Sequence, residues 1–184
     1  MRVPVLALAV GIAFVAGGGG FVLRNASAAE ASTVPGVAGT CAVDEVATAV
    51  REGDMYDDNG EFFEKVRLTF TNTSGSACVI DGHPSVVLTG PATGSWRESF
   101  RLPETGATAR VSLAAGESAH TSVRVRVLPE ARSPWQPEHL RVRLPGAAGH
   151  LVLDWPAGLV IQQDTYAAPG KALPNSVEAV AAGA

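Results

Sequence analysis

The sequence has few of the residues, and none of the short motifs, that identify the common enzyme classes. Aromatic residues make up 6% of the chain, and its 184 residues include only two cysteines, two methionines and four histidines. A G-x-S-x-G nucleophile turn, an H-E-x-x-H zinc motif and a glycine-rich phosphate loop are all missing from the sequence. We therefore expect neither a catalytic site nor a cofactor.

Lysine is also scarce, occurring only at Lys65 and Lys171, and the formal net charge of the chain is −4. An acidic surface favours solubility and does not attract nucleic acid over long distances. Hydrophobic residues make up 46% of the chain, which is enough for one globular domain with tails. The composition therefore predicts one folded domain without a nucleic-acid partner.

The first residues have the three parts of an export signal. Arg2 is followed by an apolar run from Val3 to Val15, and the small residues Ala26-Ser27-Ala28 fit a cleavage site. We expect residues 1–28 to be a signal peptide and the protein to be secreted or extracytoplasmic. The alternative is a retained anchor, because apolar residues as far as Leu23 could just cross a bilayer. Only in that case would the protein contact a membrane.

Cys41 and Cys78 both lie beyond this signal and outside any C-x-x-C pair. In an oxidising compartment, two cysteines in a small domain most simply form one disulfide, which the loop-entropy model credits with about 3 to 4 kcal/mol of stability. Lipid attachment to Cys41 is disfavoured, because the polar segment 24–33 separates this cysteine from the apolar run.

Beyond Cys41 the sequence repeatedly alternates apolar and polar residues, the pattern of strands with one buried face. The clearest examples are 61–71, 122–127 and 140–144, and residues 151–155 form another short run. Turn signals separate them at Asn59-Gly60, Asn72–Gly75, Asp81-Gly82, Ala114–Glu117 and Pro145-Gly146. We expect an all-β antiparallel sandwich of about seven to nine strands. Residues 43–51 fit both helical and strand spacing, so their structure stays open.

The rest of the chain divides around this domain. We expect residues 29–40 to be a linker and residues 41–166 to form the sandwich. Residues 167–184 are rich in alanine, proline and glycine, and we expect a flexible tail there.

Three elements of the sequence resemble a secreted actinobacterial family, domain of unknown function 4232. They are Asn72-Thr73-Ser74-Gly75 with Cys78, then Gly82 and Pro84, and finally Leu113 with Gly116-Glu117-Ser118. The resemblance covers about residues 41–165 and implies an immunoglobulin-like β-sandwich in an exported protein. It implies no activity, because the family has no catalytic residues to carry over.

Residues 102–106 read LPETG, the motif at which sortases attach proteins to the bacterial cell wall. A sortase signal stands near the C-terminus, before an apolar segment and a basic tail, and no such tail follows here. A short motif outside its structural context is a frequent false positive. We expect a loop between strands, with Pro103 and Gly106 as turn residues.

Two candidate sites involve carboxylates. Asp54, Asp57, Asp58 and Glu61 form an acidic loop with oxygen ligands of the kind that Ca²⁺ binds, but their spacing differs from the EF-hand pattern and we favour a solvated loop. Asp81 and His83 could orient each other as a catalytic pair, but we favour a polar turn there.

The remaining candidate is basic. Arg124 and Arg126 alternate with valines, as do Arg141 and Arg143 with leucine and valine. If these strands are neighbours, the four arginines form one outward stripe, flanked by His120 or His139. Arginine suits phosphate and carboxylate groups, so the partner would be an anionic envelope polymer or another envelope protein. An ordinary polar face balanced by nearby acids is the alternative.

These features together predict an exported, non-enzymatic binding or structural module of the bacterial cell envelope. The alternatives are a metal-binding or enzyme-accessory domain and a hydrolase without a recognisable motif.

Overall fold

A computed structural model of the chain describes residues 38–94, 96–127 and 134–183. The expected signal peptide, residues 1–28, and most of the expected linker lie outside these residues. Within them no helix is long and apolar enough to cross a membrane.

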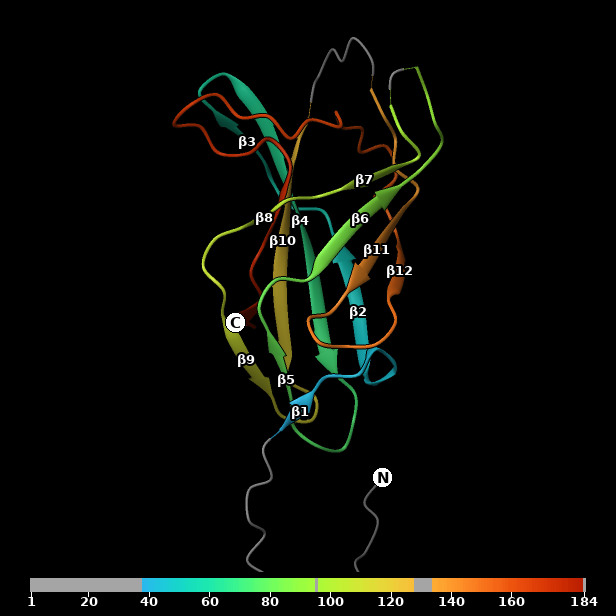
Figure 1. Cartoon of the computed structure of the whole chain (residues 1–184), viewed down its shortest axis with the longest axis vertical. Helices are drawn as coiled ribbons and strands as arrows, with labels where there is room; N and C mark the ends of the chain where they lie inside the picture. Colours follow the sequence, from blue (N-terminus) through green and yellow to red (C-terminus); the bar gives the residue numbers. More distant parts are fainter. Residues whose placement is uncertain (1–37, 95, 128–133, 184) are drawn as a thin grey trace, which may run out of the picture. The chain divides into compact units, whose positions relative to one another are not determined.

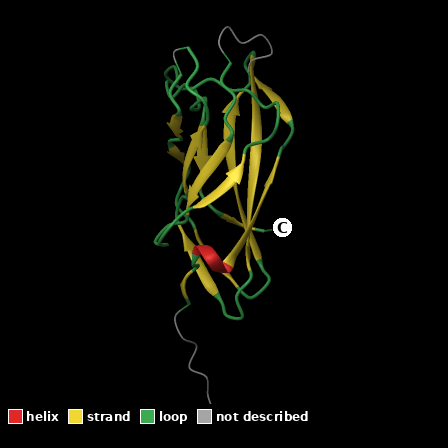
Figure 2. Cartoon of the chain, turned by 90° about the vertical axis from the view of Figure 1, so that its right-hand side faces the viewer, coloured by secondary structure: helices red, strands yellow, loops and turns green. Residues whose placement is uncertain are grey.

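The described residues form three β-sheets (Figures 1 and 2). The seven-stranded sheet has the order β2 (Val46–Arg51), β4 (Glu61–Asn72), β10 (Ser118–Arg126), β13 (Ser176–Glu178) and β8 (Glu104–Thr105), with β3 (Met55–Asp58) beside β4 and β14 (Ala181–Ala182) beside β10. The four-stranded sheet has the order β12 (Leu151–Asp154), β11 (His139–Arg143), β6 (Ser85–Thr89) and β7 (Ser99–Arg101). The three-stranded sheet has the order β1 (Gly39–Thr40), β5 (Cys78–Asp81) and β9 (Arg110–Leu113).

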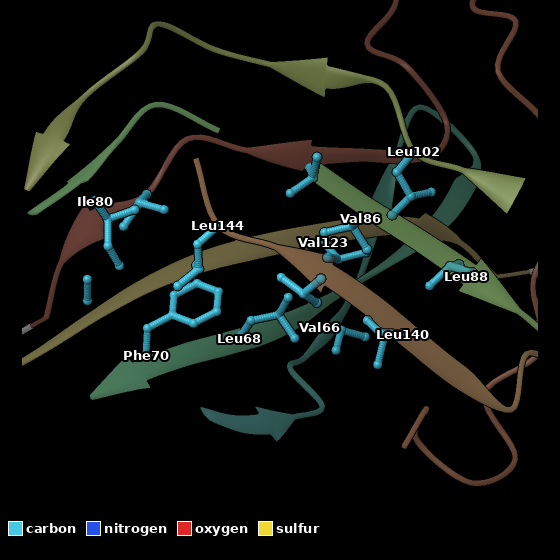
Figure 3. Packing of buried hydrophobic residues seen from close by; sticks show 14 of the residues in the cluster. Val66, Leu68, Phe70, Ile80, Val86, Leu88, Leu102, Val123, Leu140 and Leu144 are labelled. Atoms are coloured by element: carbon cyan, nitrogen blue, oxygen red, sulfur yellow. The ribbon is translucent and has the colours of Figure 1, made fainter. Parts of the chain in front are cut away.

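The seven-stranded and four-stranded sheets pack face to face around one apolar core. Figure 3 shows Val66, Leu68 and Phe70 of β4 pointing towards side chains of β6 and β11. These three side chains are completely buried, and so are Val86, Leu88 and Leu140 opposite them. Burying one such side chain stabilises the fold by about 1.5 to 3 kcal/mol. The predicted all-β sandwich is confirmed.

The described residues contain fourteen strands, more than the seven to nine that the sequence predicted. The additional strands are short: β1, β8 and β14 have two residues each. An apolar–polar alternation cannot be recognised over two residues, because the pattern needs at least four to be distinguished from a loop.

Residues 43–51, which fitted both helix and strand spacing, divide between the two. Val43–Glu45 form a single 3₁₀ turn, and Val46 then begins β2, which pairs antiparallel with β4. The backbone groups of β4 supply hydrogen-bond partners along the whole of β2, which decides in favour of the strand.

The expected disulfide between Cys41 and Cys78 is present, with 4.8 Å between the two Cα atoms. Both cysteines are buried, and the Cys41 amide also donates to the Val79 carbonyl at 3.0 Å. The bridge ties the start of the domain to β5.

The flexible tail predicted for residues 167–184 is wrong for its second half. Val177 pairs with Val123 of β10, and Ala181 and Ala182 pair with the other end of the same strand. The buried Asn175 side chain accepts a hydrogen bond from the Arg126 amide at 3.0 Å. The free edge of β10 thus orders a segment whose composition alone suggested a loose tail, and the domain extends beyond residue 166.

The linker predicted for residues 29–40 is also too long, because Gly39 and Thr40 pair parallel with Cys78 and Val79 as β1. The boundary of the domain therefore lies before Cys41.

The LPETG segment, expected to be a loop, contains the two-residue strand β8. Glu104 and Thr105 pair parallel with β13, and the Val177 amide donates to the Pro103 carbonyl at 2.9 Å. Leu102 is buried in the core (Figure 3). Gly106 does form a turn, with a φ of +85° that favours glycine.

Candidate functional site

The Asn72-Thr73-Ser74-Gly75 turn is held by one buried side chain. The Asn72 amide group donates to the carbonyl oxygens of Ser76, Leu113 and Ala114 at 2.8, 3.0 and 3.2 Å. Its oxygen accepts from the amide and the hydroxyl of Ser74 at 3.0 and 2.8 Å. Asn72 is completely buried, so this side chain stabilises the turn from within, whereas Thr73 and Gly75 are exposed.

The acidic loop and half of the predicted arginine stripe are partners of each other. The Arg124 guanidinium donates to the Asp58 carboxylate at 2.9 Å and lies 3.8 Å from the centre of the Phe63 ring. Arg126 forms ion pairs with Glu61 and with Asp164. These two arginines therefore fix the β3–β4 hairpin and the segment around Asp164 against β10.

The hydrogen bond and the charge of Arg124 lower the pKa of Asp58 below the ordinary value for aspartate. The interaction therefore stabilises the fold at neutral pH and is lost as the pH falls through this lowered pKa. Of the other loop carboxylates, Asp57 accepts a hydrogen bond from the Gly60 amide at 3.1 Å. Asp54 lines a separate depression beside Lys65. Within the described residues, no three His, Cys, Asp or Glu side chains gather as a metal site.

Asp81 and His83, the candidate catalytic pair, have separate partners. The Asp81 carboxylate forms an ion pair with Arg110 at 3.2 Å. His83 Nε2 lies 2.7 Å from the Thr105 carbonyl oxygen, to which it can donate a hydrogen bond. His83 thus links the segment after β5 to β8.

The prediction that the four arginines form a single stripe is wrong, because β10 and β11 belong to different sheets. Arg124 and Arg126 lie on the seven-stranded sheet with His120, whereas Arg141 and Arg143 lie on the four-stranded sheet. His139 shares a strand with Arg141, but its Nδ1 lies 3.3 Å from the Asp154 carboxylate. The two predicted halves of the stripe therefore have different roles.

Arg141 and Arg143 line a depression of about 440 Å³ on the outer face of the four-stranded sheet. Its lining residues come from β6, β7, β11 and the turn before β12, and we call it the arginine depression: Ser85, Val87, Arg101, Arg141, Arg143, Gly149 and His150. The outward direction of the arginines follows from the strand alternation, because Leu140 and Val142 between them are buried.

The strand register places the arginines of the depression around Val87. Arg141 of β11 is opposite Val87 of β6, and Val87 is opposite Arg101 of β7. Arg143 is opposite Ser85 in the next row. Arg141 Nη2 also lies 3.3 Å from His150 Nε2, which brings the turn before β12 to the edge of the group.

No ion pair involves Arg101, Arg141 or Arg143 within the described part of the chain. Among the described residues that line the depression there is no carboxylate either. Three guanidinium groups therefore face solvent around one hollow without a carboxylate at ion-pair distance among the described residues, on a chain whose net charge is negative. Such a surface can bind phosphate or carboxylate groups through charge-assisted hydrogen bonds.

Two other depressions have mixed charges. Arg51, Lys65 and Arg67 line one on the outer face of the seven-stranded sheet, but Glu52 and Asp54 line it too. The other, near Trp155, contains Arg51 together with Glu52 and Asp154. Acids beside the basic groups weaken the attraction of both for an anion.

Arg101 and His150 could not be recognised as site residues from the sequence. Arg101 ends a strand of three residues, too short for a recognisable alternation, and His150 lies in a turn. The alternation of Arg141 and Arg143 was the only signal for this site in the sequence.

Residues 41–178 match the family described as a domain of unknown function, DUF4232. No curated protein shows a significant match to the chain.

Proposed function

The chain belongs to the DUF4232 family, and from this premise we propose that it is an exported, non-enzymatic binding module of the bacterial cell envelope. The observation that carries the proposal is the arginine depression, in which three arginines that form no ion pair within the described residues surround one hollow. Its ligand is an anionic group on an envelope polymer or on another envelope protein.

Export is supported by the signal-like residues 1–28 and by the disulfide between Cys41 and Cys78. Disulfides persist outside the cytoplasm and are rare within it. The charge distribution fits the same setting, because an acidic protein with one basic hollow binds anions locally and stays soluble.

A binding role without catalysis is supported by the side chains around the depression. Arginine remains protonated at physiological pH and does not act as a general base. Ser85 carries the one hydroxyl among the described lining residues, and its neighbours across the sheet include Arg143. His150 contacts Arg141, so no serine–histidine–carboxylate arrangement is present among the described lining residues.

The test is a titration of the purified protein with poly(glycerol phosphate), in parallel with uncharged dextran. The variant Arg101→Ala/Arg141→Ala/Arg143→Ala removes the arginines of the depression. The control Arg67→Ala/Arg97→Ala/Arg110→Ala removes three exposed arginines elsewhere on the domain, so that both variants lose the same charge. A buffer of about 50 mM salt keeps screening weak.

We expect the wild type and the control to bind poly(glycerol phosphate), and the depression variant to bind at least about tenfold more weakly, since each charge-assisted bond contributes roughly 1.5 to 3 kcal/mol. Dextran should not bind. Equal binding of poly(glycerol phosphate) by all three proteins would contradict the proposal. Poly-glutamate serves as a second, carboxylate probe, and a wild-type protein that binds neither polymer would also contradict the proposal.

A further inference from the structure

The spacing of the arginines limits what can fill the arginine depression. Neighbouring antiparallel strands lie about 4.8 Å apart, and residues advance by about 3.4 Å along a strand. Arg141 and Arg101 are two strands apart with Val87 between them, so their Cα atoms are about 10 Å apart. Arg141 and Arg143 are two residues apart on β11, a separation of about 7 Å.

A single small anion is a poor match for this arrangement. The depression has a volume of about 440 Å³, within the range of pockets that hold ligands much larger than a phosphate ion. One phosphate bound by all three arginines would draw three positive charges together and leave most of the hollow to water. A ligand with two or three separate anionic groups would instead neutralise each guanidinium where its strand places it.

The other lining residues favour phosphate groups over acidic sugars. No tryptophan, tyrosine or phenylalanine is among the described lining residues, so the hollow offers no aromatic ring on which a sugar could stack. The planar forks of arginine match the oxygens of phosphate and of carboxylate groups two at a time, and the Ser85 hydroxyl is a further donor, so the preference for phosphate over an acidic sugar comes from the missing stacking surface.

We infer that the arginine depression binds a linear phosphodiester polymer and contacts two or three successive phosphates of one chain. This inference rests on the proposed function, since it names the ligand class of the same site. Two properties follow from it. Affinity rises with the number of linked phosphates until the three arginines are engaged, and it falls with salt, because each contact releases a counterion from the polymer.

The experiment is calorimetry of the purified protein with inorganic phosphate, with glycerol phosphate, and with glycerol phosphate oligomers of about two, three and five units, at several salt concentrations. Poly-glutamate of similar charge is the carboxylate probe. Each probe is also titrated into the single variants Arg101→Ala and Arg143→Ala, which lie at opposite corners of the depression, and into Arg110→Ala as an exposed control on β9.

We expect the affinity to rise at least about tenfold from the monomer to the oligomer of three units. The oligomer of about five units should bind each depression little more tightly than the trimer does, because the arginines extend over only about 12 Å. Arg101→Ala and Arg143→Ala should each reduce the gain, whereas Arg110→Ala should preserve it. The salt dependence should correspond to about two or three released ions.

The outcomes separate this inference from the proposed function. If a single phosphate binds as tightly as the trimer, or if poly-glutamate binds as tightly as the phosphate polymer, the ligand class inferred here is wrong while anion binding by the depression stands. If neither the phosphate polymer nor poly-glutamate binds, both this inference and the proposed function are wrong.

Discussion

Replacing Asn72 should destabilise the domain more than any other polar substitution in its turns. The Asn72→Ala variant removes the donor to the Ser76, Leu113 and Ala114 carbonyls and the acceptor for Ser74. Each hydrogen bond contributes a net 0.5 to 1.5 kcal/mol, and a buried group left without a partner costs about 1 to 3 kcal/mol. Since some of the released groups can reach water at the turn, we estimate a loss of about 2 to 4 kcal/mol.

Urea denaturation followed by circular dichroism measures this loss, provided that the slope of the unfolding free energy against urea is the same in both proteins. Asn72→Asp is the sharper variant, because it keeps the shape and turns a donor into a charged acceptor facing carbonyl oxygens. It should be at least as destabilising as Asn72→Ala. The control is Thr73→Ala, which removes one exposed hydrogen bond to the Glu45 carbonyl. A loss below about 1 kcal/mol for both Asn72 variants would refute the role of this side chain.

Three further predictions concern other parts of the fold. The variant Cys41→Ala/Cys78→Ala should lose about 3 to 4 kcal/mol in urea denaturation, because the bridge closes a loop with a sequence separation of 37; unchanged stability would argue against this contribution. Burial and the charge of Glu52 raise the pKa of Glu64, so Glu64→Gln should raise the melting temperature at neutral pH. This gain in melting temperature should vanish below the ordinary carboxyl pKa, because Glu64 is then protonated in both the folded and the unfolded protein. A gain that persists in acid would have another cause. Purified sortase should cleave at Thr105 only after unfolding, since Leu102 is 2% exposed and Glu104 pairs with β13, and cleavage of the folded protein would contradict the strand.

The strands that the sequence predicted well are the ones with a long, one-sided alternation. In β4 the buried residues Val66, Leu68 and Phe70 alternate with more exposed ones, as predicted for residues 61–71. The C-terminal strands β13 and β14 could not be recognised in this way. They have three and two residues and depend on the free edge of β10, a partner far away in the sequence.

The candidate site was half predictable for a related reason. Alternation alone placed Arg124, Arg126, Arg141 and Arg143 on outward faces, but it does not tell which strands are neighbours. The sheet order separates the two pairs and brings Arg101 to Arg141 across β6. Likewise, the acidic residue Asp58 and its partner Arg124 are separated by 66 positions, so their ion pair depends on the folded topology.

The most direct test of the arginine depression is a nuclear magnetic resonance titration of the ¹⁵N-labelled protein with poly(glycerol phosphate). We expect the largest shifts at the backbone amides of Gly149 and His150 and at the side-chain Nε–H groups of Arg101, Arg141 and Arg143. The signals of Arg124 and Arg126, which are held by Asp58 and Glu61, should stay nearly unchanged. Shifts centred on Arg51 and Arg67, or spread evenly over all exposed arginines, would contradict the assignment of the site.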